Sequence, residues 1–176
     1  MLEIHDSTLT LVVGGASSGK SAFAEKLVVN TKRPRVYIAT AQAYDAEMKS
    51  KIEAHKEMRG PDWTTIEAPF DMPDVLANVS QEKIVLIDCL TLWLSNLLLS
   101  DADLSTAGTA LNRAISDCPA PVVAVSNETG MGIVPEHALG RQFRAAQGQL
   151  NQRIAANADR VAYVVAGLPL WLKGGP

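Results

Sequence analysis

The sequence predicts an α/β fold in which a mostly parallel β-sheet carries helices on both faces. Two observations lead to this prediction. Short apolar, β-branched runs alternate with longer stretches whose apolar residues recur at helical spacing. The short runs are apolar at nearly every position, as expected of parallel strands that are buried on both faces.

The elements follow one another in a regular order along the chain. The apolar runs predict strands at residues 8–13, 35–40, 83–88, 121–126 and 160–166. Residues 168–173 follow a turn at 167–169 and can add an edge strand. Helical spacing predicts helices at 21–29, 44–57, 91–99, 106–115 and near 136–157. No repeat or linker divides the chain, so we expect a single domain over residues 1–176.

Composition narrows the class of protein. The 176 residues suit one compact domain, and 47% hydrophobic with 20% charged residues is typical of a globular protein. Lys and Arg number 16 against 19 Asp and Glu, which argues against a broad nucleic-acid-binding surface. The two cysteines and the three scattered histidines do not have the spacing of metal ligands.

The sequence also bears on location. The N-terminal residues lack a basic stretch followed by a long apolar one, so we read no signal peptide. The most apolar stretch, residues 84–99, is shorter than a membrane span and contains Asp88. We therefore expect a cytoplasmic protein without a membrane span.

Residues 14–21 read GGASSGKS and match the phosphate-binding pattern G-x-x-x-x-G-K-S. A predicted strand enters this loop and a predicted helix leaves it. Glycines let successive backbone N–H groups face an anion, and the following helix adds its positive end. The alternative is a glycine turn that only links strand to helix. We favour the P-loop, which predicts a P-loop NTPase fold of the RecA-like type and a phosphate site at Gly14, Gly15, Ala16, Ser17, Ser18, Gly19, Lys20 and Ser21.

The P-loop suggests a magnesium site. Lys20 can reach the β- and γ-phosphates, and the Ser21 hydroxyl can ligand Mg²⁺. Asp88 ends a predicted strand, where a second ligand of the metal is expected to face the same crevice. The alternative role for Asp88 is to cap the helix that begins near Thr91.

Two further segments carry polar groups without a defined role. Asn127 and Glu128 follow a predicted strand and open the segment NETGMGIVPE, whose alternative reading is a flexible turn before a helix with Pro135 in its first turn. Arg141, Arg144 and Arg153 recur at roughly helical intervals. They can bind phosphates or a neighbouring subunit, or form a solvated helix face.

His55 lies near the end of the predicted helix at 44–57, within KIEAHKEMRGPDW. A histidine near phosphates can be a nucleophile. A lone histidine on a charged helix is also compatible with a plain surface residue. Composition and spacing do not decide between the two.

The ordered set of motifs resembles the bifunctional adenosylcobinamide kinase / adenosylcobinamide-phosphate guanylyltransferase family of cobalamin biosynthesis. The resemblance extends from about Leu9 to Lys173. Its markers are GGASSGKS, YIATAQAYDAEM, CLTLWLSNLL after Asp88, NETGMGIVPE, R-x-F-R at 141–144, and the spaced residues His55, Arg59, Trp63, Glu67, Pro69, Gly148, Asn151 and Gln152. The chain departs from the family pattern at Gly60, where Pro is frequent, and at Ala145, where Asp is frequent.

The resemblance implies two activities in one enzyme. The first phosphorylates adenosylcobinamide with ATP or GTP, and the second transfers GMP from GTP to adenosylcobinamide phosphate, giving adenosylcobinamide-GDP. It implies that His55 carries the guanylyl group covalently and that Lys20 assists both reactions, with Mg²⁺ bound. It further implies a homotrimer and a guanine nucleotide site that combines the P-loop with Ala39, Thr40, Ala41, Lys56, Glu57, Met58, Arg59, Glu67 and Asp88.

Two other functions are compatible with the residues alone. The first is a P-loop kinase of another small molecule, with His55 as a bystander. The second is a non-catalytic nucleotide-switch module that signals through a partner. The Asn-Lys-x-Asp guanine reader of signalling GTPases is absent from the sequence, so the preference for GTP depends on the resemblance.

Overall fold

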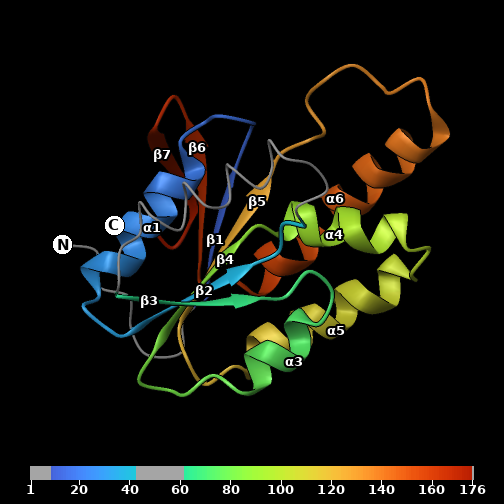
Figure 1. The fold of residues 1–176 in the computed structure, drawn as a ribbon. Helices are drawn as coiled ribbons and strands as arrows, with labels where there is room; N and C mark the ends of the chain where they lie inside the picture. Colours follow the sequence, from blue (N-terminus) through green and yellow to red (C-terminus); the bar gives the residue numbers. More distant parts are fainter. Residues whose placement is uncertain (1–8, 43–61, 176) are drawn as a thin grey trace.

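A seven-stranded sheet in the order β3-β2-β4-β5-β1-β6-β7 forms the centre of the computed structural model, which describes residues 9–42 and 62–175 (Figure 1). β1 to β6 are parallel, whereas β7 pairs with β6 in the antiparallel sense at one edge. The strands are β1 (Leu9–Gly14), β2 (Arg35–Ala39), β3 (Trp63–Glu67), β4 (Ile84–Asp88), β5 (Val122–Asn127), β6 (Arg160–Val165) and β7 (Leu168–Lys173).

Helices cover both faces of the sheet. One face carries α1 (Lys20–Asn30), and the other carries α3 (Met72–Ala77), α4 (Leu90–Leu99), α5 (Leu104–Asp117) and α6 (Ala138–Asn157) (Figure 1). A hydrophobic core lies on each face of the sheet, and β1 contributes side chains to both, because alternate side chains of a strand point to opposite faces. Leu11 and Val13 pack in the core under α3 to α6, whereas Val12 packs under α1. None of the helices in the described ranges is long and apolar enough to span a membrane.

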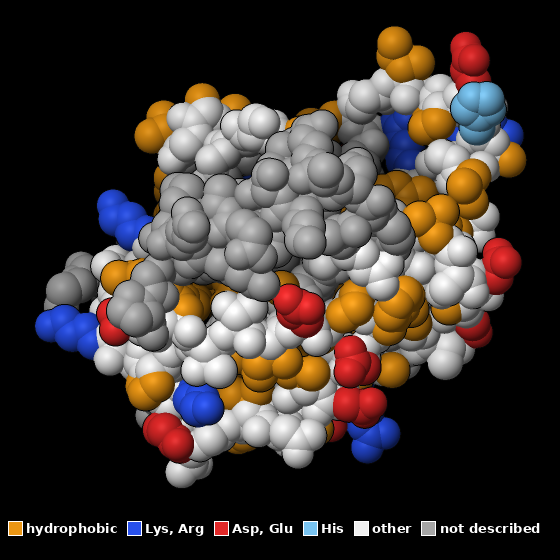
Figure 2. Space-filling view, viewed as in Figure 1, with side chains coloured by type: hydrophobic (Ala, Val, Ile, Leu, Met, Phe, Trp, Pro, Cys, Tyr) orange, Lys and Arg blue, Asp and Glu red, His pale blue; other side chains and the backbone are white. Residues whose placement is uncertain are grey.

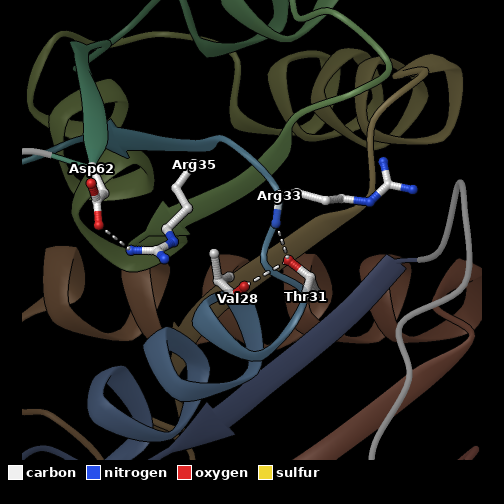
Figure 3. Close-up of polar contacts among 5 residues, drawn as sticks. All are labelled: Val28, Thr31, Arg33, Arg35 and Asp62. Carbon is white, nitrogen blue, oxygen red and sulfur yellow. Dashed lines mark hydrogen bonds and ion pairs between the residues drawn. The ribbon is translucent and has the colours of Figure 1, made fainter.

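The connection from α1 into β2 is fixed by local polar contacts, which Figure 3 shows. The Thr31 hydroxyl donates to the Val28 carbonyl at 2.7 Å and accepts from the Arg33 N–H at 3.3 Å. Four residues later, Arg35 forms an ion pair with Asp62 at 3.6 Å, and its guanidinium lies 5.7 Å from the Trp63 ring centroid. These contacts join the starts of β2 and β3, so that their opposite ends meet the site.

The predicted elements are largely confirmed. All five predicted strands and the edge strand at 168–173 are present, and α1, α4, α5 and α6 lie at four of the predicted helices. The fifth, at 44–57, lies outside the described residues. Trp93 and Leu97 of α4 are buried in the core. The placement of Pro135 in a first helical turn was wrong, because α6 begins at Ala138.

Within the described residues, the sequence analysis missed two elements. β3 is an edge strand with intermediate and exposed residues, so it lacks the apolar run that marks a buried strand. α3 has only six residues, too few for helical periodicity to stand out. The expectation of a single domain over residues 1–176 stays a prediction.

Candidate nucleotide-binding site

The carboxyl ends of neighbouring strands bring the predicted site residues to one edge of the sheet. In the strand register Gly14 lies opposite Asn127, and Ala39 lies opposite both Asp88 and Glu67. In open α/β sheets such an edge, at a change of strand order, is where ligands bind. The structure therefore places residues from β1, β2, β3, β4 and β5 at the same edge of the sheet.

The P-loop runs from the end of β1 to the start of α1 and is closely packed. Gly19 has φ 89°, in the left-handed region that favours glycine. A Cβ atom at Gly19 would lie 2.9 Å from Gly167 Cα, and one at Gly14 would lie 2.6 Å from the Val164 carbonyl oxygen. The first and last glycines of the motif are thus required by their surroundings.

Backbone contacts from two other segments hold the loop in place. The Gly167 N–H donates to the Ser18 carbonyl at 2.8 Å, from the turn between β6 and β7. The Glu128 N–H donates to the Gly14 carbonyl at 2.9 Å, from the end of β5. A preorganised loop of this kind presents backbone N–H groups and the positive end of α1 to an anion.

Lys20 is the one lysine among the buried polar and charged side chains of the described residues, with 9% of its surface exposed. Its Nζ donates to the Gly15 carbonyl at 3.0 Å, so the ammonium group is folded over the loop. A buried cation is costly unless it is paired, and a carbonyl is a weaker partner than a phosphate. The arrangement therefore favours capture of a phosphate by this side chain.

Ser21 and Asp88 meet as the metal prediction requires. The Ser21 hydroxyl donates to Asp88 Oδ1 at 3.4 Å, and the Tyr37 hydroxyl donates to Asp88 Oδ2 at 3.3 Å. A hydroxyl beside a carboxylate is an oxygen-only donor set, which fits Mg²⁺, an ion that completes its shell with phosphate oxygens and water. α4 takes Cys89, and not Asp88, as its N-cap residue. Tyr37 was not predicted, since nothing in its sequence neighbourhood distinguishes it from a core aromatic residue.

Residues at the end of β2 differ in their exposure and contacts. Ala39 and Ala41 are half-buried at the edge, near the exposed Glu67 at the end of β3. Thr40, by contrast, is fully buried. Its hydroxyl donates to the Cys89 carbonyl at 2.8 Å and accepts from the Cys89 N–H at 2.9 Å. The Thr40 side chain thus ties β2 to the start of α4.

A buried polar network fixes the end of β5, and the sequence reasoning found only part of it. Ser126 Oγ donates to Asn151 Oδ1 at 2.6 Å, and Gln147 Nε2 donates to Ser126 Oγ at 2.9 Å. Asn151 Nδ2 donates to the Asn127 carbonyl at 3.0 Å, while the Asn127 N–H donates to Thr91 Oγ1 at 2.8 Å. Amide side chains four residues apart on the buried face of α6 were the signal that could have revealed the network.

One predicted group of site residues lies outside the described ranges, and one residue beside the site was not predicted. His55 and the segment 56–59, which comprises Lys56, Glu57, Met58 and Arg59, lie outside the described residues. Cys89 lies beside the site, but burial, and secondly the Asp88 charge, raise the pKa of its thiol. Since the thiolate is the nucleophilic form, this shift of the pKa disfavours Cys89 as a nucleophile.

A family model and curated relatives match most of the chain and have related descriptions. The family model described as cobinamide kinase / cobinamide phosphate guanyltransferase matches residues 10–172. The bifunctional adenosylcobalamin biosynthesis protein CobP of Pseudomonas aeruginosa is 43% identical over 169 residues, covering 94% of this chain and 98% of the relative. The bifunctional adenosylcobalamin biosynthesis protein CobU of Escherichia coli is 38% identical over 181 residues, covering 94% and 99%.

Solved structures with little sequence identity share the fold. The flagellar accessory protein FlaH from Methanocaldococcus jannaschii aligns with a TM-score of 0.55 at 14% identity, covering 98% of this chain and 83% of that chain. A KaiC-like protein from Pyrococcus horikoshii aligns with a TM-score of 0.52 at 12% identity, covering 90% and 71%. These likenesses confirm the predicted fold class and show the fold alone.

Proposed function

Because the chain belongs to the cobinamide kinase / cobinamide phosphate guanyltransferase family, we propose that it is a bifunctional transferase whose two reactions share one P-loop. The enzyme phosphorylates adenosylcobinamide with ATP or GTP. It then transfers GMP from GTP to adenosylcobinamide phosphate and gives adenosylcobinamide-GDP. The observation that carries the proposal is the meeting of Lys20, Ser21 and Asp88 at the carboxyl edge of the sheet.

In the kinase step, the hydroxyl group of the aminopropanol arm attacks the γ-phosphorus of the nucleotide. The bond from that phosphorus to the bridging oxygen breaks, and the nucleoside diphosphate leaves. Such a transfer requires positioning and charge stabilisation more than covalent help. Lys20 and the loop N–H groups supply both. Glu128 is our candidate for receiving the hydroxyl proton. Its backbone N–H is hydrogen-bonded to the carbonyl of Gly14, the first residue of the P-loop, so it lies beside the loop.

In the transferase step, a ring nitrogen of His55 attacks the α-phosphorus of GTP. A P–N bond forms, the bond to the bridging oxygen breaks, and pyrophosphate leaves. An oxygen of the acceptor's phosphate then attacks the same phosphorus and displaces the imidazole. Two displacements replace one difficult step, and a neutral imidazole is available for the first at pH 7.

The groups around the reacting phosphates have distinct tasks. Lys20 and the loop amides bind the leaving pyrophosphate, while Lys56 and Arg59 offset charge at the α-phosphate. Ala39, Thr40, Ala41, Glu57, Met58 and Glu67 complete the guanine nucleotide site. Ser21 and Asp88 would hold Mg²⁺, which supplies charge neutralisation on the phosphate oxygens. A homotrimer and a cytoplasmic location are part of this proposal.

The experiment uses α-labelled GTP and Mg²⁺ with the full chain, followed by denaturation and mass-spectrometric mapping. We expect an acid-labile GMP adduct on His55 in the native protein. His55→Ala should abolish the adduct and the transfer while it leaves the kinase activity largely intact. His137→Ala, at an exposed histidine before α6, is the matched control and should behave like the native protein.

Two results would contradict the proposal. A GMP adduct that persists in His55→Ala would remove the role of that histidine. The absence of both an adduct and phosphorylation of adenosylcobinamide in the native protein would favour a P-loop kinase of another small molecule.

A further inference from the structure

A basic hollow of about 400 Å³ lies between the segment after β5 and the first turns of α6. Arg141, Arg144 and Gln152 line it from α6, and the glycines Gly130 and Gly148 leave room within it. In Figure 2, Lys and Arg side-chain atoms are visible in a recess at the upper right, over this part of the chain. The volume is in the range of small-ligand sites, about 300–1,000 Å³.

Among the described residues, no carboxylate forms an ion pair with either of the two arginines. Arg141 Nη1 donates to the Pro135 carbonyl at 3.1 Å and to the Glu136 carbonyl, and Arg144 Nη2 donates to the Gly130 carbonyl. Arg144 Nη1 is buried and has no hydrogen-bond partner within residues 9–42 and 62–175. A buried donor left unpaired is costly, so the site is better suited to holding an anion than to standing empty.

The helix dipole argues against the idea that these arginines only stabilise the fold. Arg141 lies in the first turn of α6, where the helix dipole disfavours cations and favours anions. A phosphate in the hollow would reverse this repulsion, because it would pair with both guanidinium groups. Arg is the side chain best matched to phosphate, since its planar fork can donate two parallel hydrogen bonds.

A backbone hydrogen bond joins the segment beside the hollow to the P-loop. That segment begins at Glu128, whose N–H donates to the Gly14 carbonyl. On the rim of the hollow, the side chains of Met131, Ile133 and Val134 are 79%, 96% and 64% exposed. A basic pocket beside exposed apolar side chains fits a ligand that has an anionic head and a bulky, partly apolar body.

We propose that this hollow binds the phosphate monoester of the acceptor, which is the group that receives GMP. This inference rests on the proposed function and adds to it the site at which Arg141 and Arg144 hold the second substrate. The rim side chains contact the body of the acceptor.

The test separates acceptor binding from the reaction with GTP. Arg144→Gln and Arg141→Gln remove the charge and retain similar size, and Arg113→Gln on the exposed face of α5 is the matched control. We expect the KM for the phosphorylated acceptor in GMP transfer to rise about 10- to 100-fold, as for loss of a charge-assisted hydrogen bond. Formation of the GMP adduct from GTP alone should be unchanged. Inorganic phosphate should compete with the acceptor in the native enzyme and more weakly in the variants.

Three outcomes would count against the account, each at a different level. Absence of a GMP adduct in the native enzyme would overturn the proposed function. An adduct that transfers with an unchanged acceptor KM in both variants would overturn the hollow as the acceptor site. A raised KM accompanied by a smaller particle in size-exclusion chromatography would also overturn it, because the arginines would then hold a subunit contact.

Discussion

Lys20 shows how one side chain can serve two reactions. Its ammonium group is largely buried at the start of α1, where it donates to the loop carbonyl of Gly15. Because both proposed reactions displace a group from a nucleoside triphosphate, both need the same charge over the same phosphates. The loss of this residue should therefore not distinguish between them.

Lys20→Ala should lower kcat/KM of the kinase and of GMP transfer by about 10²- to 10³-fold each, as is typical when one preorganised group is removed. Lys26→Ala, an exposed lysine on the same helix, removes the same charge and should change neither rate appreciably. Initial rates of both reactions, measured on one preparation, provide the comparison. Retention of either activity in Lys20→Ala would argue against a shared phosphate site.

Cys89 gives a prediction about stability and pH. Burial raises the pKa of its thiol above the ordinary value of 9.0, so the thiol stays neutral in the folded state where it would ionise in the unfolded one. The contribution to stability is therefore complete below that value and is lost as the pH rises towards the folded pKa. The loss is at most about 1.4 kcal/mol per pH unit.

Urea unfolding of the native protein and of Cys89→Ala measures this effect. The difference in unfolding free energy between the two should be constant below about pH 8 and should shrink above about pH 9. Taking the difference removes the titration of tyrosines and lysines, which both proteins share. A difference that stays constant through about pH 10 would contradict the assignment.

At the scale of elements, the P-loop depends on the hairpin formed by β6 and β7. Ala166 and Gly167 connect these strands with φ 51° and 77°, the signature of a tight two-residue hairpin turn. The turn reaches the loop closely enough that Gly167 N–H bonds to Ser18 and leaves no space beside Gly19. The β6–β7 turn therefore shapes the P-loop, although the two segments lie about 150 residues apart in the sequence.

Gly19→Ala should destabilise the fold and disrupt the loop. A left-handed conformation costs an alanine roughly 1–2 kcal/mol, and the new Cβ would also press on Gly167. Gly15→Ala is the control, because an added Cβ there meets no heavy atom of the described residues within 4 Å, and it should cost less than about 0.5 kcal/mol. Thermal and urea unfolding measure both. Equal stability of the two variants would show that the contact between the turn and the loop is not limiting.

The elements also show what the sequence could and could not predict. The buried strands and amphipathic helices were predictable, because their apolar spacing is set by which faces the core covers. That Ser21 and Asp88 lie close together was predictable, because a P-loop motif and an aspartate at the end of a parallel strand are expected at the same edge of the sheet. Tyr37, Gln147 and the turn at Gly167 were not, since their roles arise from strand order, which local spacing does not encode. β3 was missed because its place at the edge of the sheet leaves it without an apolar run.

At the scale of the whole molecule, charge is distributed unevenly. The chain carries a formal net charge of −3, yet Lys20, Arg141 and Arg144 lie along the segments that surround the carboxyl edge of the sheet. Asp88, Glu67 and Glu128 lie at the same edge, so the positive charge is confined to the P-loop and the hollow, where it can hold phosphate groups without a general affinity for nucleic acid. Such a distribution suits an enzyme in which both substrates of the second reaction carry phosphate.

The central claim is that the P-loop at 14–21 holds a triphosphate where the imidazole of His55 can attack it. A crystal structure of the full chain with Mg²⁺ and a GTP analogue that resists cleavage at the α-phosphorus tests this most directly. We predict that the β- and γ-phosphates lie on the loop amides and Lys20, and that a His55 ring nitrogen lies about 3–3.5 Å from the α-phosphorus. A triphosphate seated in the loop with the imidazole out of reach of that phosphorus in every copy would contradict the account.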